Sequence, residues 1–371
     1  MLPSSKPILF IGEAWGEAEA KLGLSFIGSS GIELLRQLDI AKVITFTPSD
    51  KQRISEYYST GNSRAIDRIW AAHQYFIRRT NVFNQHPPGG ALEYFCGSKS
   101  EGLPGFGALL PSRYVRRSFS HELDRLGDEI LELDPNLIIC LGNSALWALT
   151  GKTGIRKLRG TTCISTHTVA GYKLLCTYHP SATLRQPDIR STTIADLSKI
   201  LREKDSSHVT RPSCEIWIEP DLDDIRTFFR LHCPSGSQVA VDIETSGNRV
   251  TCIGFAPRKD LALVIPFDDE RAAGRSYWTS ASLEQQCWSL IREFLEDASI
   301  KKIFQNGLYD IAFLLRSVGI RTFGATHDTM LLHHALQPEA LKGLGYLGSM
   351  YTDHGPWKSE RKGTETIKRD E

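Results

Sequence analysis

Long hydrophobic runs are missing from this sequence of 371 residues. No run approaches the roughly 18 apolar residues that a helix needs to cross a bilayer. The N-terminal stretch has neither the basic region nor the cleavage site of a signal peptide, and its apolar residues predict a first core strand. With 41% hydrophobic and 23% charged residues, the composition is typical of a soluble globular protein. We therefore expect a protein without a membrane partner.

Paired cysteines are missing as well. None of the eight cysteines belongs to a C-x-x-C pair, so the sequence indicates neither a zinc site nor a disulfide framework. The cysteines stand singly, at Cys96, Cys140, Cys163, Cys176, Cys214, Cys233, Cys252 and Cys287. Such a pattern is typical of a reducing, cytosolic environment. The sequence also contains no internal repeat and no low-complexity segment.

The formal net charge of +1 hides an asymmetry along the chain. Residues 1–205 contain 25 Lys and Arg against 20 Asp and Glu, a net of +5, whereas the rest contain 19 against 23, a net of −4. A mildly basic first half suits contact with a polyanion, although ordinary scatter also produces an excess of this size. The change of sign favours two domains.

A linker separates these two halves. The stretch LREKDSSHVTRPSCE is polar, contains Ser-Ser and a proline, and follows a helical pattern that ends near Ile200. We therefore predict a first domain over residues 1–204, a linker over 205–214 and a second domain over 215–371.

The first half alternates between strand and helix patterns. The predicted elements are Ile8–Ile11, Ser30–Leu38, Ser120–Leu133, Asn136–Leu141, Ser144–Leu149 and Lys173–Thr177. Such alternation predicts a parallel sheet in an α/β layered fold. In folds of this class, ligands bind beyond the carboxyl ends of the strands.

Polar side chains follow three of the predicted strands. Glu13 and a glycine-rich loop with Phe26 follow the first, Asn81 lies beside the end of another, and His179 and Ser181 follow a third. A glycine-rich loop is often only a turn, and a single histidine is more often a core or surface residue than a catalyst. Their occurrence together at strand ends favours a ligand pocket.

Five motifs occur in a characteristic order: GEAWGEAEA…GLSFIGSSGIELL, TNVFNQHPP, NLIICLGNSALWALTG, KLRG at Lys157–Gly160, and YHPSATLR. Over roughly residues 7–200 they resemble the uracil-DNA glycosylase superfamily, and most closely its family-4-like branch. The resemblance implies a three-layer α/β/α domain in which water removes a flipped-out uracil from its sugar. It also implies that main-chain N–H groups near Gly28–Gly31 and at Ser181 hold DNA phosphates.

The resemblance assigns a role to each matched side chain. Phe26 would stack on uracil, and Asn81 would pair with its Watson–Crick edge. His179 would stabilise the negative charge that develops on uracil O2 as the base leaves. Glu13 would orient the water or stabilise the oxocarbenium-like sugar.

The sequence departs from the family pattern at three places. Trp15 stands where the family has proline, and its larger side chain could narrow or cover the pocket. Family-4 enzymes carry an iron–sulfur cluster on four cysteines, one pair of them near the N-terminus. Here the N-terminus has no cysteine, and Gln85 stands at the position of a further one, so we expect no iron–sulfur cluster. Leu38–Arg79 and Gly89–Leu110 look like insertions. These departures leave open a domain that binds DNA without cutting it.

The second half contains two carboxylates at a strand end. VAVDIETSG spans Val239–Gly247, and Asp242 and Glu244 occupy alternate positions, so both side chains point to one face. Two carboxylates at such a short separation repel each other unless a cation lies between them. Mg²⁺ prefers such oxygen ligands. The alternative is a pair of acids that simply faces water.

Further elements support a site at this strand end. A predicted antiparallel pair follows, at Val250–Ala256 and Leu261–Phe267. The strand Lys302–Phe304 then runs into QNGLYDIAFLLRSVGI, where Asn306 is the predicted N-cap of a helix and Asp310 supplies a third carboxylate one turn later. Asp328, in HDTMLLHHAL, is either a further acid of the site or only the N-cap of another helix.

This pattern resembles the DEDD-type 3′–5′ exonucleases, and most closely the proofreading domain of family-A DNA polymerases, over roughly residues 215–360. VDIET and QNGLYD match its first two motifs. The resemblance implies a ribonuclease H-like mixed sheet. It also implies two Mg²⁺ or Mn²⁺ ions between Asp242, Glu244, Asp310 and the 3′-terminal phosphate of DNA, with Asn306 beside the substrate.

The third exonuclease motif, Y-x-x-x-D, is absent. The candidates Tyr346 and Tyr351 are followed four residues later by Met350 and Gly355 rather than by aspartate. We expect a truncated N-terminal piece of a phage-like family-A polymerase, or one product of a split gene whose partner completes the site. A degenerate, inactive exonuclease fold is the alternative. If the chain proves active as it stands, Glu360 is the first acid to consider.

Together these patterns predict a DNA repair or replication enzyme. The first domain would excise or recognise uracil, and the second would trim 3′ ends. The alternative is a DNA-binding, uracil-sensing module whose degenerate exonuclease fold docks a polymerase. The expected partners are DNA, as single strands or 3′ ends, and a DNA polymerase domain or chain. The expected location is the cytoplasm of a bacterial or phage-infected cell, close to the nucleoid.

Overall fold

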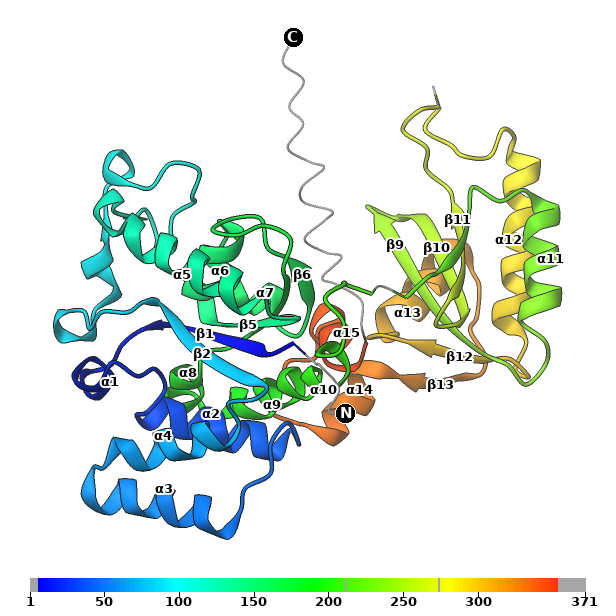
Figure 1. Cartoon of the computed structure of the whole chain (residues 1–371). Helices are drawn as coiled ribbons and strands as arrows, with labels where there is room; N and C mark the ends of the chain where they lie inside the picture. Colours follow the sequence, from blue (N-terminus) through cyan, green and yellow to red (C-terminus); the bar gives the residue numbers. More distant parts are fainter. Residues whose placement is uncertain (1–5, 211, 273, 353–371) are drawn as a thin grey trace. The chain divides into compact units, whose positions relative to one another are not determined.

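The computed structural model describes residues 6–210, 212–272 and 274–352. The described residues before Pro212 form one compact unit together with those from Gly345 onward, and Pro212–Leu344 form a second (Figure 1). The division before Pro212 falls inside the predicted linker. None of the helices within the described residues is both long enough and apolar enough to span a bilayer.

The first unit is built on a five-stranded sheet with the strand order β2-β1-β5-β7-β6. The strands are β1 (Ile8–Ala14), β2 (Ile77–Phe83), β5 (Leu137–Leu141), β6 (Thr162–Ile164) and β7 (Lys173–Thr177). All neighbours are parallel except the edge strand β6, which runs antiparallel to β7. All residues of β5 and β7 are buried, as expected for central strands covered on both faces. The predicted parallel sheet is confirmed.

Helices cover both faces of this sheet (Figure 1). The helices are α1 (Glu17–Leu22), α2 (Ser29–Ile40), α3 (Pro48–Thr60), α4 (Ser63–Ala72), α5 (Ser120–Leu133), α6 (Gly142–Thr150), α7 (Ile155–Leu158), α8 (Pro180–Arg185), α9 (Arg190–Ser198) and α10 (Ile200–Glu203). Side chains alternate along β1: Leu9 and Ile11 pack with α5 and α6, whereas Ile8 and Phe10 pack with α2, α4 and α9. The result is the predicted three-layer α/β/α domain.

The two predicted insertions have defined structures. The first contains the helices α3 and α4; Thr47 caps α3 with Pro48 as its first residue, and Asn62 caps α4. The apolar face of α4 joins the core beside α2 through Ile66, Ile69 and Trp70. The second contains short 3₁₀ turns at Pro88–Gly90, Leu92–Phe95 and Lys99–Glu101 and the strand β3 (Cys96–Gly97), which pairs with β4 (Tyr114–Val115) just beyond the predicted end at Leu110.

The second unit contains a six-stranded mixed sheet with the order β13-β12-β9-β10-β11-β8. The strands are β8 (Glu215–Ile218), β9 (Gln238–Ser246), β10 (Arg249–Arg258), β11 (Leu261–Pro266), β12 (Lys301–Phe304) and β13 (Ala325–Asp328). The predicted antiparallel pair of β10 and β11 is confirmed, and β9 adds antiparallel to β10. The remaining neighbours are parallel. This is the mixed sheet of the predicted ribonuclease H-like fold.

The helices of the second unit are α11 (Leu222–His232), α12 (Ala281–Glu296), α13 (Leu308–Val318) and α14 (Thr329–Leu336). Helices α11 and α12 pack on the sheet through aromatic contacts: the ring centroids of Phe229 in α11 and Phe294 in α12 each lie 5.0 Å from that of Phe255 in β10. Phe267, just after β11, stacks on Trp288 of α12 at 4.1 Å. These contacts hold β9 and β10 in place at the centre of the sheet.

The last described helix, α15 (Leu344–Tyr351), packs with the first unit. Lys199 Nζ donates to the carbonyl oxygen of Ser349 at 2.6 Å, and Arg159 donates to the hydroxyl of Ser349 at 2.9 Å. Tyr346 shares a hydrogen bond of 2.7 Å with Thr192. We predicted one domain over 215–371, and the contacts of α15 differ from that division. The exact domain boundaries stay a prediction.

Candidate active sites

The candidate glycosylase residues lie at the carboxyl ends of neighbouring parallel strands. Glu13 is near the end of β1, Asn81 lies in β2 and pairs in register with Gly12, and His179 follows β7 by two residues. Because β2, β1, β5 and β7 are neighbours in that order, residues far apart in sequence meet along one edge of the sheet. The rings of Phe26 and His179 are 6.0 Å apart between centroids.

Gly12 leaves room for this convergence. A Cβ atom at position 12 would lie 2.2 Å from Asn81 Oδ1 and 2.5 Å from Phe26 Cζ, closer than any real contact. Phe26 itself has a φ of 57° and is buried. Its carbonyl oxygen accepts a hydrogen bond of 2.8 Å from Trp70 in the α4 insertion. The insertion that we predicted from sequence therefore helps to hold the aromatic side chain of the pocket.

His179 is held in one tautomer. Its Nδ1 accepts from the main-chain N–H of Ser181 at 3.2 Å and lies 2.7 Å from the hydroxyl of Ser181. Because a main-chain N–H can only donate, Nδ1 carries no proton, and the neutral ring carries its proton on Nε2. Burial lowers the pKa of His179, and Arg185 lowers it further against the opposing effect of Glu13. The neutral ring therefore presents Nε2 as a donor.

Ser181 has a different role from the one expected. We predicted that its main-chain N–H holds a DNA phosphate, but that group donates to His179 Nδ1. Ser181 thus positions the histidine. Gly28 is the N-cap of α2, and a Cβ atom there would meet nothing within 4 Å. The N-terminus of α2 is therefore open at this point, and its contact with a phosphate stays a prediction.

Sequence reasoning missed three residues that organise the site. Ser144, fully buried in the first turn of α6, donates to Glu13 Oε2 at 2.7 Å. Glu19 joins the two ends of the glycine-rich loop, because it accepts from the N–H groups of Gly16 at 2.7 Å and Ile27 at 3.2 Å. Burial raises the pKa of Glu19, against the effect of these bonds. The third is Ser25. The signals were present: Ser144 lies within a matched motif, and Glu19 has capping-box spacing from Gly16.

Trp15 lies next to the residue expected to read the base. Trp15 Nε1 and Asn81 Nδ2 both lie 3.2 Å from the hydroxyl oxygen of Ser25 and donate to it. The main chain of Trp15 is held by Gln85, whose carbonyl oxygen accepts a hydrogen bond from the Trp15 N–H at 3.2 Å. The indole therefore shares a hydrogen-bond partner with Asn81, and a narrowing of the pocket by Trp15 stays a prediction.

The carboxylates of the second unit gather around β9. Asp242 and Glu244 are exposed on one face of the strand and alternate with the buried Val241 and Ile243. Asp310, buried in the first turn of α13, accepts from the N–H of Ile243 at 3.1 Å. This N–H is available because β12 pairs with β9 only as far as Ala240.

Burial and nearby negative charges both disfavour the ionised form of Asp310. Its pKa is raised from an ordinary 3.8 to about 6, first by burial and then by the nearby charges of Asp242 and Asp328. Oxygen ligands of this kind suit Mg²⁺ or Mn²⁺. Among the described residues, however, no group of three or more His, Cys, Asp or Glu side chains is arranged to hold a metal ion.

Asp328 is an N-cap. Its Oδ1 accepts from the N–H groups of Met330 and Leu331 in α14, at 2.8 and 3.3 Å. It also binds the N–H groups of Asn306 at 3.1 Å and Gly307 at 2.8 Å. Burial raises its pKa, but these four bonds outweigh that effect and the pKa is lowered overall. The N-cap role of Asp328 is confirmed, and a further role as an acid of the site stays a prediction.

The prediction that Asn306 caps α13 was wrong. The N-cap is Gly307, and Asn306 lies in a left-handed turn with a φ of 60°, exposed at the surface. The carboxylate of Asp328 accepts hydrogen bonds from the main-chain N–H groups of this turn. A site role for the Asn306 side chain stays a prediction. Of the positions considered for the missing third motif, Tyr346 and Met350 lie in α15, whereas Gly355 and Glu360 lie outside the described residues.

Comparison with known protein families agrees with both halves of this geometry. Residues 2–202, more than half of the chain, match the family described as the uracil DNA glycosylase superfamily. The chain belongs to this superfamily. Residues 223–363 match a second family, described as 3′–5′ exonuclease and associated with DNA polymerase family A. Residues 2–202 thus belong to the uracil DNA glycosylase superfamily, and residues 223–363 resemble the 3′–5′ exonuclease family.

One curated relative is a DNA polymerase of Bacillus phage SP01, 27% identical over 244 residues. The match covers 57% of this chain and 25% of the polymerase, so this chain spans about a quarter of that relative's length. Among solved structures, Brucella melitensis NrnC with bound Mg²⁺ has a TM-score of 0.27 at 21% identity, covering 38% of this chain and 62% of that one. Escherichia coli RNase D, an exoribonuclease, has a TM-score of 0.30 at 18% identity, covering 40% of this chain and 36% of that one.

Proposed function

We propose that the first unit hydrolyses the bond between uracil and deoxyribose in DNA. The observation that carries this proposal is the convergence of Glu13, Asn81 and His179 at adjacent strand ends, with the proton of His179 on Nε2. A pocket that only bound uracil would need neither an acid facing the sugar nor a histidine fixed as a donor.

Each side chain has a distinct task in this reaction. Uracil would stack on Phe26 and accept a hydrogen bond from Asn81. As the bond between N1 and C1′ breaks, the electron pair moves onto the base, and His179 Nε2–H stabilises the charge on O2. Water adds to C1′ and loses its proton, so the products are free uracil and an abasic site. Glu13, oriented by Ser144, orients the water or stabilises the positive sugar.

The test is release of uracil from a single-stranded oligonucleotide in EDTA, detected as abasic sites. Asn81→Asp should lower the rate because it removes the amide donor to uracil O4. Asn62→Asp is the matched control, since aspartate also caps a helix and this position lies outside the site. An absence of abasic sites with the enzyme in excess over DNA would favour a uracil sensor.

For the second unit we propose a metal-dependent 3′–5′ exonuclease whose site is incomplete in this chain. Asp242, Glu244 and Asp310 would hold Mg²⁺ or Mn²⁺. Bound divalent ions supply a nucleophilic hydroxide and stabilise the leaving 3′ oxygen. The buried carboxyl of Asp310, close enough to Asp242 for their charges to interact, supports a cation at this place. Glu244 would contribute from the same exposed face.

The expected activity of this unit is weak, Mn²⁺-dependent trimming of 3′ ends. Asp242→Ala should abolish it, whereas Asp260→Asn, which changes an acid paired with Arg258 in a loop, should not. Fusing a C-terminal extension that carries Y-x-x-x-D should raise the rate by orders of magnitude. Brisk degradation of single-stranded DNA in Mg²⁺ by the chain as it stands would contradict the proposal that an acid is missing.

The second candidate function is a non-catalytic module that senses uracil and docks a polymerase. The missing Y-x-x-x-D motif favours it for the second unit. Either function implies DNA as a partner, a polymerase domain or chain nearby, and the cytoplasm of a bacterial or phage-infected cell.

A further inference from the structure

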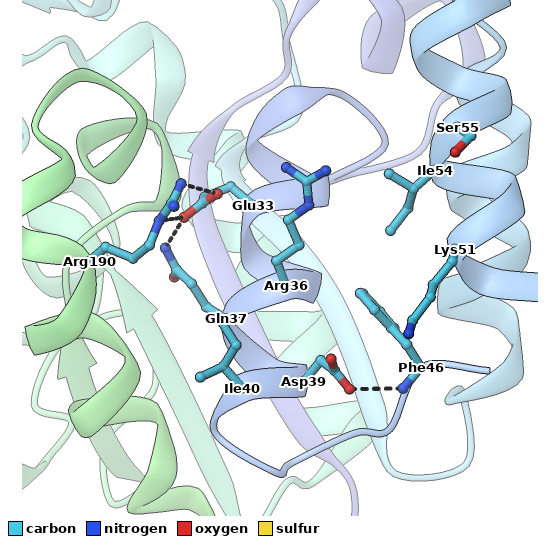
Figure 2. Close-up of a pocket in the computed structure, with 10 residues that line it drawn as sticks. All are labelled: Glu33, Arg36, Gln37, Asp39, Ile40, Phe46, Lys51, Ile54, Ser55 and Arg190. Carbon is cyan, nitrogen blue, oxygen red and sulfur yellow. Dashed lines mark hydrogen bonds and ion pairs between the residues drawn. The ribbon is translucent and has the colours of Figure 1, made fainter. Parts of the chain in front are cut away.

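A pocket with no part in uracil removal lies between α2 and the inserted helix α3 (Figure 2). Its volume is about 340 Å³, at the lower end of the range in which proteins bind small ligands. It is lined by Glu33, Arg36, Gln37, Asp39, Ile40, Phe46, Lys51, Ile54, Ser55 and Arg190. None of these belongs to the glycosylase residues described above. The pocket exists because the α3–α4 insertion packs beside α2.

The rear wall of the pocket is rigid and electrically neutral. Glu33 is buried and forms a two-pronged ion pair with Arg190, at 2.7 and 2.8 Å. Gln37 donates to the same carboxylate at 2.7 Å and lies 2.8 Å from the hydroxyl of Thr183. Figure 2 shows these groups turned toward one another, on one side of α2. Glu33 and Arg190 are therefore satisfied without a ligand.

The opposite side of the pocket carries two cations that no acid pairs. Arg36 is exposed and forms no ion pair with any described residue; its guanidinium lies 3.5 Å from the hydroxyl of Tyr58 and 5.5 Å from the centre of the Tyr58 ring. Lys51, also exposed, has no ion pair or side-chain hydrogen bond within the described residues. The one acid on this side, Asp39, uses Oδ1 to accept from the N–H of Phe46 at 2.9 Å. Arg36, Lys51 and Arg190 together outweigh Glu33 and Asp39 by one positive charge, so the pocket favours an anion.

The chain segment that contributes Arg36 and Lys51 to the pocket also carries a net positive charge. Residues 36–79 contain 8 Lys and Arg against 4 Asp and Glu, a net of +4. This segment therefore supplies most of the +5 carried by residues 1–205. Apolar side chains also line the pocket: Ile40 at the end of α2, Phe46 in the loop and Ile54 in α3. A ligand must therefore combine a negative group with an apolar or aromatic body.

We propose that this pocket binds one nucleotide, with its phosphate between Arg36 and Lys51 and its base against Phe46 and Ile54. A phosphate beside a flat base matches this pairing of cations with apolar walls, and stacking of bases on aromatic side chains tolerates any base. The nucleotide is either part of a DNA strand or free. The proposal rests on DNA as the chain's substrate but not on uracil removal, because no residue of that reaction is involved.

The position of the pocket suits a strand that also reaches the glycosylase site. Helix α2 begins at Ser29, directly after the loop that carries Phe26, and its later turns form the pocket. Thr183, whose hydroxyl accepts a hydrogen bond from Gln37, lies in α8, and α8 begins directly after His179. One rigid framework therefore carries both sites, and a nucleotide held here would fix the path of the strand.

The test measures binding of a fluorescein-labelled oligothymidylate, which contains no uracil, by fluorescence anisotropy. Arg36→Gln and Lys51→Gln should each weaken binding by about three- to ten-fold and reduce the slope of log K against log salt by about one. Arg64→Gln is the matched control, because Arg64 is an exposed cation of the same insertion that does not line the pocket. It should change the affinity less than two-fold, within about 0.4 kcal/mol.

A second arm separates the two sources of the nucleotide. Thymidine monophosphate is titrated as a competitor against the labelled strand, with wild type and with Lys51→Gln. Competition that Lys51→Gln removes would assign the pocket to a free nucleotide as well, whereas no competition would restrict it to nucleotides within a strand. Equal losses in Arg64→Gln and Lys51→Gln would indicate general attraction to a basic surface and overturn the proposal. Unchanged binding in both pocket variants would overturn it too.

A third measurement keeps this proposal separate from the proposed function. His179→Ala should abolish uracil release but leave the binding of oligothymidylate dependent on Lys51. If wild type releases no uracil while Lys51→Gln still weakens strand binding, the glycosylase proposal fails and the nucleotide pocket stands.

Discussion

Replacing Asp310 by asparagine isolates the electrostatic strain of the exonuclease site. Asparagine keeps an oxygen that can accept the N–H of Ile243, so the bond that joins α13 to β9 can persist. It removes the charge that Asp242 and Asp328 oppose. Because Asp310 is only 4% exposed, solvent screens little of this repulsion. The variant should therefore differ from wild type mainly in how stability depends on pH.

The sign of that difference follows from the pKa of Asp310. The folded protein holds its proton up to about pH 6, whereas an unfolded chain releases it near the ordinary 3.8. Raising the pH through this window therefore favours the unfolded state of wild type. At about 1.36 kcal/mol for each pKa unit, the difference between about 6 and 3.8 costs wild type about 3 kcal/mol. Below the window, the free energies of unfolding of wild type and variant should lie close together.

The assay must report on the second unit alone, because two compact units do not guarantee a single unfolding transition. Hydrogen exchange of β9 amides in EDTA, at several pH values between about 4 and 8, measures the local free energy of opening after correction for the intrinsic exchange rate. Wild type should lose stability relative to Asp310→Asn as the pH rises to about 6, and then run parallel to it. Adding Mn²⁺ should restore more stability to wild type than to the variant.

Asp297 provides a control of opposite sign. The hydroxyl and N–H of Ser299 lower its pKa, so its contribution is present at neutral pH and is lost as the pH falls. Asp297→Asn should therefore cost stability at neutral pH and little in acid. If the difference between wild type and Asp310→Asn does not change between about pH 4 and 7, Asp310 is not strained by its neighbours. The electrostatic argument for a cation at this place would then be refuted.

Three further predictions concern the first unit. Gly12→Ala should reduce uracil release by about 100-fold or more, because the added methyl displaces Asn81 and Phe26; abasic-site formation measures this, with circular dichroism as the check on folding. Trp15→Ala, which removes the indole but keeps the main-chain N–H that donates to Gln85, should raise kcat/KM for uracil release, and an unchanged value would show that the indole does not narrow the pocket. Lys199→Met should speed hydrogen exchange in α15, because carbonyl groups that it binds at 2.6 Å lose a buried donor, at a cost of about 1–3 kcal/mol.

The fold was predictable where local patterns and tertiary packing agree. The apolar residues at the centre of Lys173–Thr177 predict a strand with these bounds. The structure has that strand, buried along its whole length. Parallel strands then carry Glu13, Asn81 and His179 to one edge without further information. Asp242 and Glu244 were predictable for a similar reason, because alternation along β9 fixes which side chains share a face, whereas Asp310 was predictable from its place in the first turn of the helix that follows β12.

The failures have tertiary causes. Asn306 is a good helix cap by composition, but Asp328, some twenty positions later, captures its main-chain N–H and holds it in a left-handed turn. Nothing local to Asn306 indicates this. The bonds of Ser144 to Glu13 and of Ser181 to His179 likewise depend on where strands end in space. Helix α15 packs against Lys199 through main-chain carbonyls, which carry no sequence signal at all.

The two sites differ in what the protein alone supplies. At His179, a main-chain N–H fixes the tautomer and burial keeps the ring neutral, so the donor is ready before any substrate arrives. At Asp310, the same factor, burial, works against the charged form that a metal ligand needs, and Asp242 adds to the cost. Only a cation can reverse that balance. Uracil release should therefore persist in EDTA, whereas any trimming of 3′ ends should disappear, and loss of both activities in EDTA would contradict this division.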